Sequence, residues 1–184
     1  MMKSLCIASI GSNRMPSFSF PTSSNRCRLI QKALDTLDKE DAANIVSSIK
    51  GKVYLLVHDH NGNHVIQRSI AKINEYVALS DLEDHEVDEV TLTNLITALD
   101  IIIDEVTANM KELAKHPYGC RVVQRLIEHS VGEQKVRVLD CVFEGDMTNE
   151  LITHEYGNYV IQRALTYGRP QGKLLNKVLE LRPS

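Results

Sequence analysis

The sequence lacks the signatures of several large classes of protein. It has no run of about 18 apolar residues, the length that a membrane-spanning helix needs. The phosphate-binding motifs GxxxxGK[ST] and GxGxxG and the nucleophile motif GxSxG are also absent. We therefore expect a protein that is not an enzyme, needs no cofactor and has no membrane partner.

Cysteine is scarce and widely spaced. The four residues are Cys6, Cys27, Cys120 and Cys141. No two of them form a close Cys-x-x-Cys pair, so we expect no structural zinc site and no disulfide framework. Residues 1–12 resemble a secretion signal only weakly, because the apolar stretch Leu5–Ile10 is shorter than such a signal needs. These observations favour a reducing compartment, and we expect a cytoplasmic protein.

Lysine and arginine are absent from residues 73–110, a segment that holds ten acidic residues. The net charge of −3 would by itself argue against a nucleic-acid partner. Outside this segment, however, 21 basic residues stand against 14 acidic ones, a balance of +7. The most acidic part, Asp81–Val90, is expected to be a solvated loop, with the docking of a basic partner as the alternative.

Four segments align without gaps and share a glutamine at their fifth position. They are CRLIQKAL from Cys27, NHVIQRSI from Asn63, CRVVQRLI from Cys120 and NYVIQRAL from Asn158. The first two begin 36 residues apart and the last two 38, whereas the middle pair is separated by 57. This spacing predicts a structural repeat with a loop insertion at about residues 76–97.

Apolar residues at helical spacing predict that each segment is a helix packed against its neighbours. The clearest stripes are Val65, Ile66, Ile70 and Ile73, and Val122, Val123, Leu126 and Ile127. Two further helical patterns, Ile45–Leu56 and Leu99–Leu113, precede the second and third segments. The pattern predicts an all-α solenoid over residues 25–184, after an irregular segment, 1–24, that contains two prolines and several serines.

The connections between these helices carry two recurring residue types. A glycine precedes three of the segments, at Gly62, Gly119 and Gly157, and we expect it to end one helix and let the chain turn. Histidines lie just before the same turns, at His58, His60, His116 and His154. We expect them to cap or pack rather than to bind metal. A hydrolase based on Cys120 and His116 lacks a third orienting group and an oxyanion motif.

Polar side chains recur on one face of the predicted helices. The first and fifth residues of each segment lie four apart and share a face, with the second residue beside them. An amide can donate to and accept from the edge of a nucleobase, and a flat side chain can stack on its ring. The pattern therefore predicts a surface for unpaired RNA bases. Alternatively, such residues are only solvated, and Cys27 and Cys120 are small core residues.

These residues resemble the base-reading helices of the Pumilio (PUF) family, and the resemblance covers residues 25–182. It implies a right-handed α-solenoid of three-helix repeats. The pairs that resemble uracil readers are Asn63 with Gln67 and Asn158 with Gln162. The pairs that resemble adenine readers are Cys27 with Gln31 and Cys120 with Gln124. The residues at the family's stacking position are Arg28, His64, Arg121 and Tyr159.

The antiparallel binding of the family implies that this chain recognises 5′-UAUA-3′ in single-stranded RNA. The resemblance further implies a regulator that binds messenger RNA in the 3′ untranslated region and works with regulatory proteins. A basic residue follows each glutamine, at Lys32, Arg68, Arg125 and Arg163. These four are predicted to reach phosphates, with a salt-bridged flank as the alternative.

The chain departs from the family in length and at its first repeat. A complete domain has about eight repeats, of which four are present here, and Asn25-Arg26 replace the aromatic or polar residue and glycine found before the other segments. Truncation at both ends would expose apolar surface, which predicts marginal stability or self-association. The alternative function is a helical scaffold that binds proteins, or a fragment with little affinity for RNA.

Overall fold

The computed structural model describes residues 24–80 and 87–168, and these form ten α-helices and no strand. The helices are α2 (Ser24–Thr36), α3 (Lys39–Ser47), α4 (Val53–His58), α5 (Gly62–Leu79), α6 (Glu89–Ala108), α7 (Met110–Leu113), α8 (Gly119–His129), α9 (Gly132–Val142), α10 (Met147–Thr153) and α11 (Gly157–Tyr167). The expectation of an all-α solenoid is confirmed. Residues 1–23, most of the segment predicted to be irregular, lie outside the described residues, as do residues 81–86 of the acidic insertion and residues 169–184.

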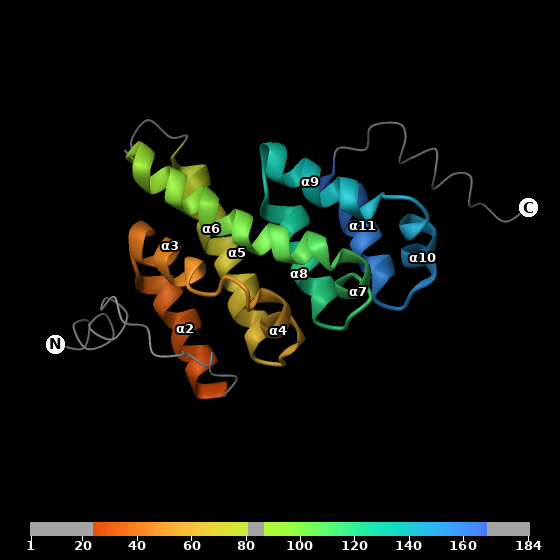
Figure 1. Cartoon of the computed structure of the whole chain (residues 1–184), viewed down its shortest axis with the longest axis horizontal. Coiled ribbons are helices and arrows are strands. Elements are labelled where there is room, and N and C mark those ends of the chain that lie inside the picture. Colours follow the sequence, from red (N-terminus) through yellow and green to blue (C-terminus); the bar gives the residue numbers. More distant parts are fainter. Residues whose placement is uncertain (1–23, 81–86, 169–184) are drawn as a thin grey trace, which may run out of the picture.

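The helices form two principal rows that lie side by side along the length of the molecule (Figure 1). One row consists of α2, α5, α8 and α11, each packed on the next, and each carrying one of the four glutamines. We call it the glutamine row. The outer row consists of α3, α6 and α9, with α6 packed between the other two. Short helices α4, α7 and α10 each lead into the next helix of the glutamine row.

Both predicted apolar stripes are buried between the rows. Ile66, Ile70 and Ile73 of α5 are completely buried, as are the four stripe residues of α8. Leu99, Ile102 and Ile103 of α6 complete the same continuous core. Burial of a Leu, Ile or Val side chain contributes about 1.5–3 kcal/mol, so this core supplies the main force that stacks one repeat on the next.

Each of the two helical patterns that precede the second and third segments is divided into two helices in the structure. The pattern Ile45–Leu56 is broken between α3 and α4, where Gly51 adopts a φ of 74°. Such a left-handed conformation ends a helix and favours glycine. The pattern Leu99–Leu113 is broken at Asn109 between α6 and α7. Each full repeat therefore contains three helices.

The surplus residues of the middle repeat lengthen two helices. Helix α5 has 18 residues, whereas α8 and α11 in the same row have 11 each. Helix α6 has 20 residues, whereas α3 and α9 in the outer row have 9 and 11. Within the segment at about 76–97, residues 76–79 and 89–97 are helical. The loop expected over Asp81–Val90 is therefore corrected at its end, because Glu89 and Val90 already belong to α6. Asp88 caps α6 by accepting a hydrogen bond of 2.9 Å from the backbone N–H of Thr91.

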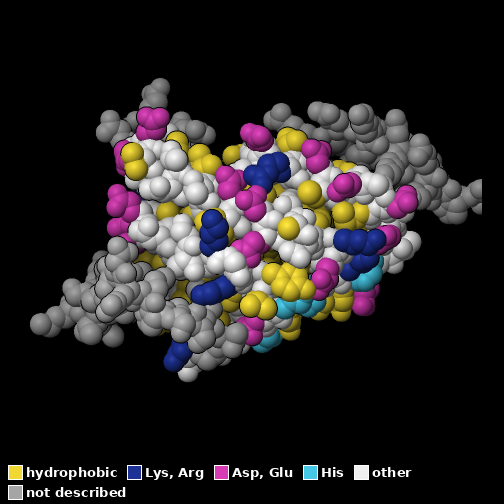
Figure 2. Space-filling model, in the orientation of Figure 1, with side chains coloured by type: hydrophobic (Ala, Val, Ile, Leu, Met, Phe, Trp, Pro, Cys, Tyr) yellow, Lys and Arg dark blue, Asp and Glu magenta, His cyan; other side chains and the backbone are white. Residues whose placement is uncertain are grey.

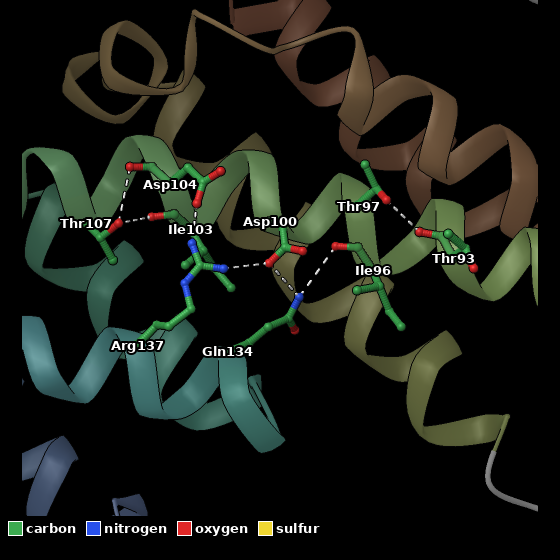
Figure 3. A network of polar contacts seen from close by, with 9 residues as sticks. All are labelled: Thr93, Ile96, Thr97, Asp100, Ile103, Asp104, Thr107, Gln134 and Arg137. Carbon is green, nitrogen blue, oxygen red and sulfur yellow. Dashed lines mark hydrogen bonds and ion pairs between the residues drawn. The ribbon is translucent and has the colours of Figure 1, made fainter.

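Polar contacts join α6 to α9 in the outer row (Figure 3). The Arg137 guanidinium bridges Asp100, at 3.0 Å, and Asp104. The Gln134 amide donates to the same Asp100 carboxylate at 3.1 Å. Acidic and basic side chains are interspersed over this face, on which the outer row lies (Figure 2). Within the described residues, none of the helices has the length and apolar character that crossing a membrane requires.

Candidate RNA-binding surface

Side chains from the preceding turn hold the N-termini of three helices in the glutamine row. At α8 and α11 the caps are His116 and His154, whose Nδ1 atoms each accept two backbone N–H bonds of 3.2–3.3 Å. At α5 the cap is Asp59, whose Oδ1 accepts from the N–H groups of Asn61 and Gly62. The prediction that histidines cap these turns is confirmed for His116 and His154. The Asp59 cap was not predicted, although aspartate is a common capping residue.

The glycine before each segment acts differently from the prediction. Gly62, Gly119 and Gly157 are the first residues of their helices, and none has a positive φ. A Cβ atom at Gly62 would lie 2.7 Å from the carbonyl oxygen of Leu56. A Cβ atom at Gly119 or Gly157 would lie similarly close to Leu113 or Leu151. Glycine is therefore needed at the start of α5, α8 and α11, because the preceding short helix lies so close.

The two Asn–Gln pairs have the same internal geometry. Gln67 Nε2 donates to Asn63 Oδ1 at 2.9 Å, and Gln162 Nε2 donates to Asn158 Oδ1 at 3.0 Å. In each pair the asparagine Nδ2 donates to two backbone carbonyls of the preceding turn. Both amides are thus oriented before any ligand arrives. Each glutamine keeps one N–H and its carbonyl oxygen outside this internal pairing.

The Cys–Gln pair on α8 is held by the backbone instead. Gln124 Nε2 donates to the carbonyl oxygen of Cys120 at 2.9 Å, and Cys120 Sγ donates to that of Pro117 at 3.5 Å. Cys120 and Cys27 are both buried, and burial is the main cause that raises the pKa of each thiol. The thiols therefore stay neutral at physiological pH, and both cysteines pack as small buried residues.

The same contacts argue against the hydrolase alternative. His116 Nδ1 accepts backbone N–H groups rather than the Cys120 thiol, which donates to Pro117. A nucleophilic cysteine needs a lowered pKa, whereas that of Cys120 is raised.

The four residues at the predicted stacking position are all exposed: Arg28, His64, Arg121 and Tyr159. The Arg121 guanidinium lies 5.9 Å from the centre of the Tyr159 ring on the next helix. Flat groups of neighbouring repeats are therefore spaced along the same edge as the amides. The structure places the stacking candidates beside the base-edge candidates on every helix of the row.

Three of the four predicted phosphate contacts are ion-paired within the chain. Arg68 pairs with Asp35 on α2, and Arg163 pairs with Glu128 on α8 at 2.7 Å. Arg125 pairs with the same Glu128, at 3.1 Å, within its own helix. The alternative of a salt-bridged flank therefore describes these three arginines, while Lys32 is exposed.

A groove of about 660 Å³ runs along α5 between α2 and α8. At one end it is lined by Gln31, His64 and Gln67, which belong to the predicted base surface. It continues past Ala71 and Arg125 toward the C-terminal half of α5. The predicted site residues on three adjacent helices thus border one open channel. No cluster of residues in the described ranges could hold a metal ion.

Comparison with known proteins identifies the repeat. The model of the Pumilio-family RNA-binding repeat matches residues 27–50, 52–76, 109–143 and 148–174, which together make up more than half of the chain. A Pumilio domain-containing protein of Schizosaccharomyces pombe is 28% identical over 144 residues, 78% of this chain and 18% of that protein. Fem-3 mRNA-binding factor 2 of Caenorhabditis elegans is 28% identical over 159 residues, 76% of this chain and 22% of that protein.

Solved structures agree with this assignment. The Puf3 RNA-binding domain bound to a Cox17 RNA 3′ UTR recognition sequence matches 82% of this chain and 38% of its own, with 32% identity and a TM-score of 0.62. PUF-8 in complex with PBE-RNA matches 86% and 42%, with 27% identity and a TM-score of 0.66. The chain thus spans about a fifth of the curated relatives described above and about two fifths of these solved domains. On its repeats, its fold and these likenesses, the chain belongs to the Pumilio (PUF) family of RNA-binding repeat proteins.

Proposed function

We propose that this chain binds single-stranded RNA and reads the sequence 5′-UAUA-3′ with one base on each helix of the glutamine row. The observation that carries the proposal is the row itself. Four glutamines in the same register lie on four adjacent helices, and two of them are oriented by hydrogen bonds to asparagines. The Puf3 and PUF-8 structures were solved with RNA, which supports the same class of ligand.

The chemistry of the glutamine amide fits the two expected bases. The carbonyl oxygen and the second N–H of Gln67 or Gln162 match a uracil edge, which offers the N3–H donor and a carbonyl acceptor. An adenine edge offers one donor and one acceptor as well. Discrimination must therefore come from the partner of each glutamine, which is an asparagine side chain in two repeats and a cysteine in the other two.

The order of the pairs sets the sequence. With RNA antiparallel to the chain, as the family resemblance implies, Asn158/Gln162 takes the first uracil and Cys120/Gln124 the first adenine. Asn63/Gln67 then takes the second uracil. We extend the proposal to binding in 3′ untranslated regions of messenger RNA, with an effect on translation or decay through regulatory proteins in the cytoplasm. The RNA named in the Puf3 complex supports the 3′ UTR as the location.

Fluorescence polarisation with two short RNAs tests the reading of a single base. The RNA CCUAUACC contains the proposed sequence once, and CCUACACC replaces only the uracil expected at Asn63/Gln67. We expect CCUAUACC to bind at least about five-fold more tightly, since one mismatched base costs about 1–3 kcal/mol. The double variant Asn63→Ala/Gln67→Ala should lose this preference.

A matched variant on another repeat makes the test specific. Asn158→Ala/Gln162→Ala should weaken binding of both RNAs and keep the preference between them, because it removes a different base site. Equal binding of both RNAs by the unaltered chain would contradict sequence reading at α5. No binding of either would contradict the proposed function and favour a helical scaffold for proteins.

A further inference from the structure

A ladder of ion pairs crosses the glutamine row, one residue beyond the glutamines. In each pair, the arginine directly follows the glutamine of its helix. Its acidic partner lies on the preceding helix of the glutamine row, four residues after the glutamine of that helix. Arg68 on α5 pairs in this way with Asp35 on α2, and Arg163 on α11 pairs with Glu128 on α8. Each such pair places a carboxylate beside the arginine that follows a glutamine.

The ladder is interrupted between α5 and α8. The residue four positions after Gln67 is Ala71, which has no carboxylate to form an ion pair with the guanidinium of Arg125 on α8. The other acid of α5 on this groove, Glu75, forms an ion pair of 3.0 Å with Lys72 of its own helix. Among the described residues, the acid that pairs with Arg125 is therefore Glu128, one turn along the same helix.

Glu128 cannot neutralise both of its partners. One carboxylate oxygen lies 2.7 Å from Arg163 and the other 3.1 Å from Arg125, so two guanidiniums share one negative charge. His129, 3.4 Å from Arg125, adds no negative charge, and burial is the main cause that lowers its pKa. The cluster carries a net charge of about +1, in contrast to the neutral pair of Arg68 and Asp35.

Arg125 and Glu128 both line the groove that begins at His64 and Gln67. The side chain of Arg125 is about half exposed, whereas that of Glu128 is only 15% exposed. An anion in the groove would thus meet the guanidinium rather than the carboxylate. We infer that Arg125 contacts a backbone phosphate of the bound RNA, and that the absence of an acid at Ala71 keeps this cation available. The inference rests on the proposed function.

The substitution Ala71→Glu tests the inference without removing any cation or altering any base contact. It restores the acid expected from the ladder, and Arg125 should then pair with α5 instead of RNA. Ala71 lies on the half-buried surface of a long helix, where glutamate is well tolerated. The variant Ala71→Gln has nearly the same size and no charge, and serves as its control.

The readout is the salt dependence of binding to CCUAUACC. Each phosphate contact to single-stranded RNA contributes about −0.7 to the slope of log K against log salt. Between 50 and 200 mM salt, binding of the unaltered chain should therefore weaken by about 2.5-fold more than that of Ala71→Glu. Arg125→Gln should show the same shallower slope, and Ala71→Gln the slope of the unaltered chain.

The possible failures are distinguishable. If the unaltered chain binds CCUAUACC selectively and the slopes of Ala71→Glu and Arg125→Gln equal its own, the phosphate contact is absent while the proposed function stands. If the unaltered chain binds no RNA, both are overturned. Circular dichroism melts of the variants identify any loss of folding. If Ala71→Glu does not fold, the slope of Arg125→Gln decides alone.

Discussion

The rings of His58 and His116 lie 4.3 Å apart, centre to centre, although the residues belong to consecutive repeats. His58 ends α4, and its Nε2 lies 3.2 Å from Glu112. His116 caps α8 through Nδ1, which accepts two backbone N–H groups and must be unprotonated to do so. Burial, and then the neighbouring His58, lower the pKa of His116, while Glu112 acts in the opposite direction. The fold therefore favours the neutral form of His116.

This preference predicts a loss of stability in mild acid. The unfolded chain binds a proton at His116 near the ordinary pKa of about 6.5, whereas the folded chain resists it. Stability should therefore fall as the pH decreases from about 6.5 toward the lower folded pKa, and His129, whose pKa is also lowered, should add to the effect. Urea denaturation between about pH 7 and pH 5 measures this. In His116→Asn, which can cap without titrating, the decrease should be shallower, and an unchanged pH profile would contradict the assignment.

Gly119→Ala should destabilise the protein through a backbone contact. The added Cβ would meet the carbonyl oxygen of Leu113 and lie 2.9 Å from its Cα atom, neither of which is a flexible side-chain end. Forcing α7 and α8 apart should cost about 1–3 kcal/mol, as overpacking of a core does. Thermal denaturation measures the loss. Asn94→Ala, at an exposed position of α6, is the control and should have little effect. If Gly119→Ala were as stable as this control, α7 and α8 could move apart without loss of stability and the prediction would be wrong.

Glu105 on α6 holds the start of α4, more than 50 residues earlier in the chain. Its carboxylate accepts hydrogen bonds from the backbone N–H groups of Gly51 and Val53, the latter at 3.0 Å. Removing this cap in Glu105→Ala should cost about 1 kcal/mol of unfolding free energy, the usual value for a lost helix cap. Glu105→Gln keeps one acceptor oxygen and should lose less. Equal loss in the two variants would indicate that the charge, rather than the hydrogen bonding, is what stabilises α4.

The core and the register of the site residues were predictable from the sequence because the same segment is repeated four times. Packing residues such as Ile70 and Leu126 and the glutamine register recur at fixed spacing, so one chain contains four copies of the same signal. The capping role of His116 and His154 was accessible for the same reason. Site residues on neighbouring helices could thus be placed together before their contacts were known.

Features that depend on distant or subtle contacts were not predictable in this way. The Glu105 cap joins residues far apart in the sequence, and the role of Gly62 depends on how closely α4 approaches α5. The acidic composition suggested a loop up to Val90, while α6 already begins at Glu89 behind its cap, Asp88. Since aspartate is a common capping residue, Asp88 could have indicated the start of this helix from the sequence. Ion pairing of Arg68 with Asp35 follows from the stacking of helices, which the sequence of one repeat does not contain.

The repeats themselves supply a substitution that should change the base read by α8. Cys120 is 1% exposed, and the corresponding Asn63 of α5 is 2% exposed, so the position accommodates an asparagine in this fold. In Cys120→Asn, the new Nδ2 can donate to the carbonyls of His116 and Pro117, as Asn63 donates to those of Asp59 and His60. Gln124 Nε2, which now donates to the backbone carbonyl of residue 120, would then donate to the asparagine Oδ1, as in the two Asn–Gln pairs.

We therefore expect Cys120→Asn to exchange the preference for adenine at this position for uracil. Competition between CCUAUACC and CCUUUACC, which differ only at the base proposed for α8, measures the exchange. The unaltered chain should prefer the first RNA and the variant the second, each by about 1 kcal/mol or more. Cys141→Ser, on α9 and away from the glutamine row, should keep the original preference. If Cys120→Asn folds and still prefers adenine, then the asparagine does not determine the choice of base, and the bond from Gln67 to Asn63 has only a structural role.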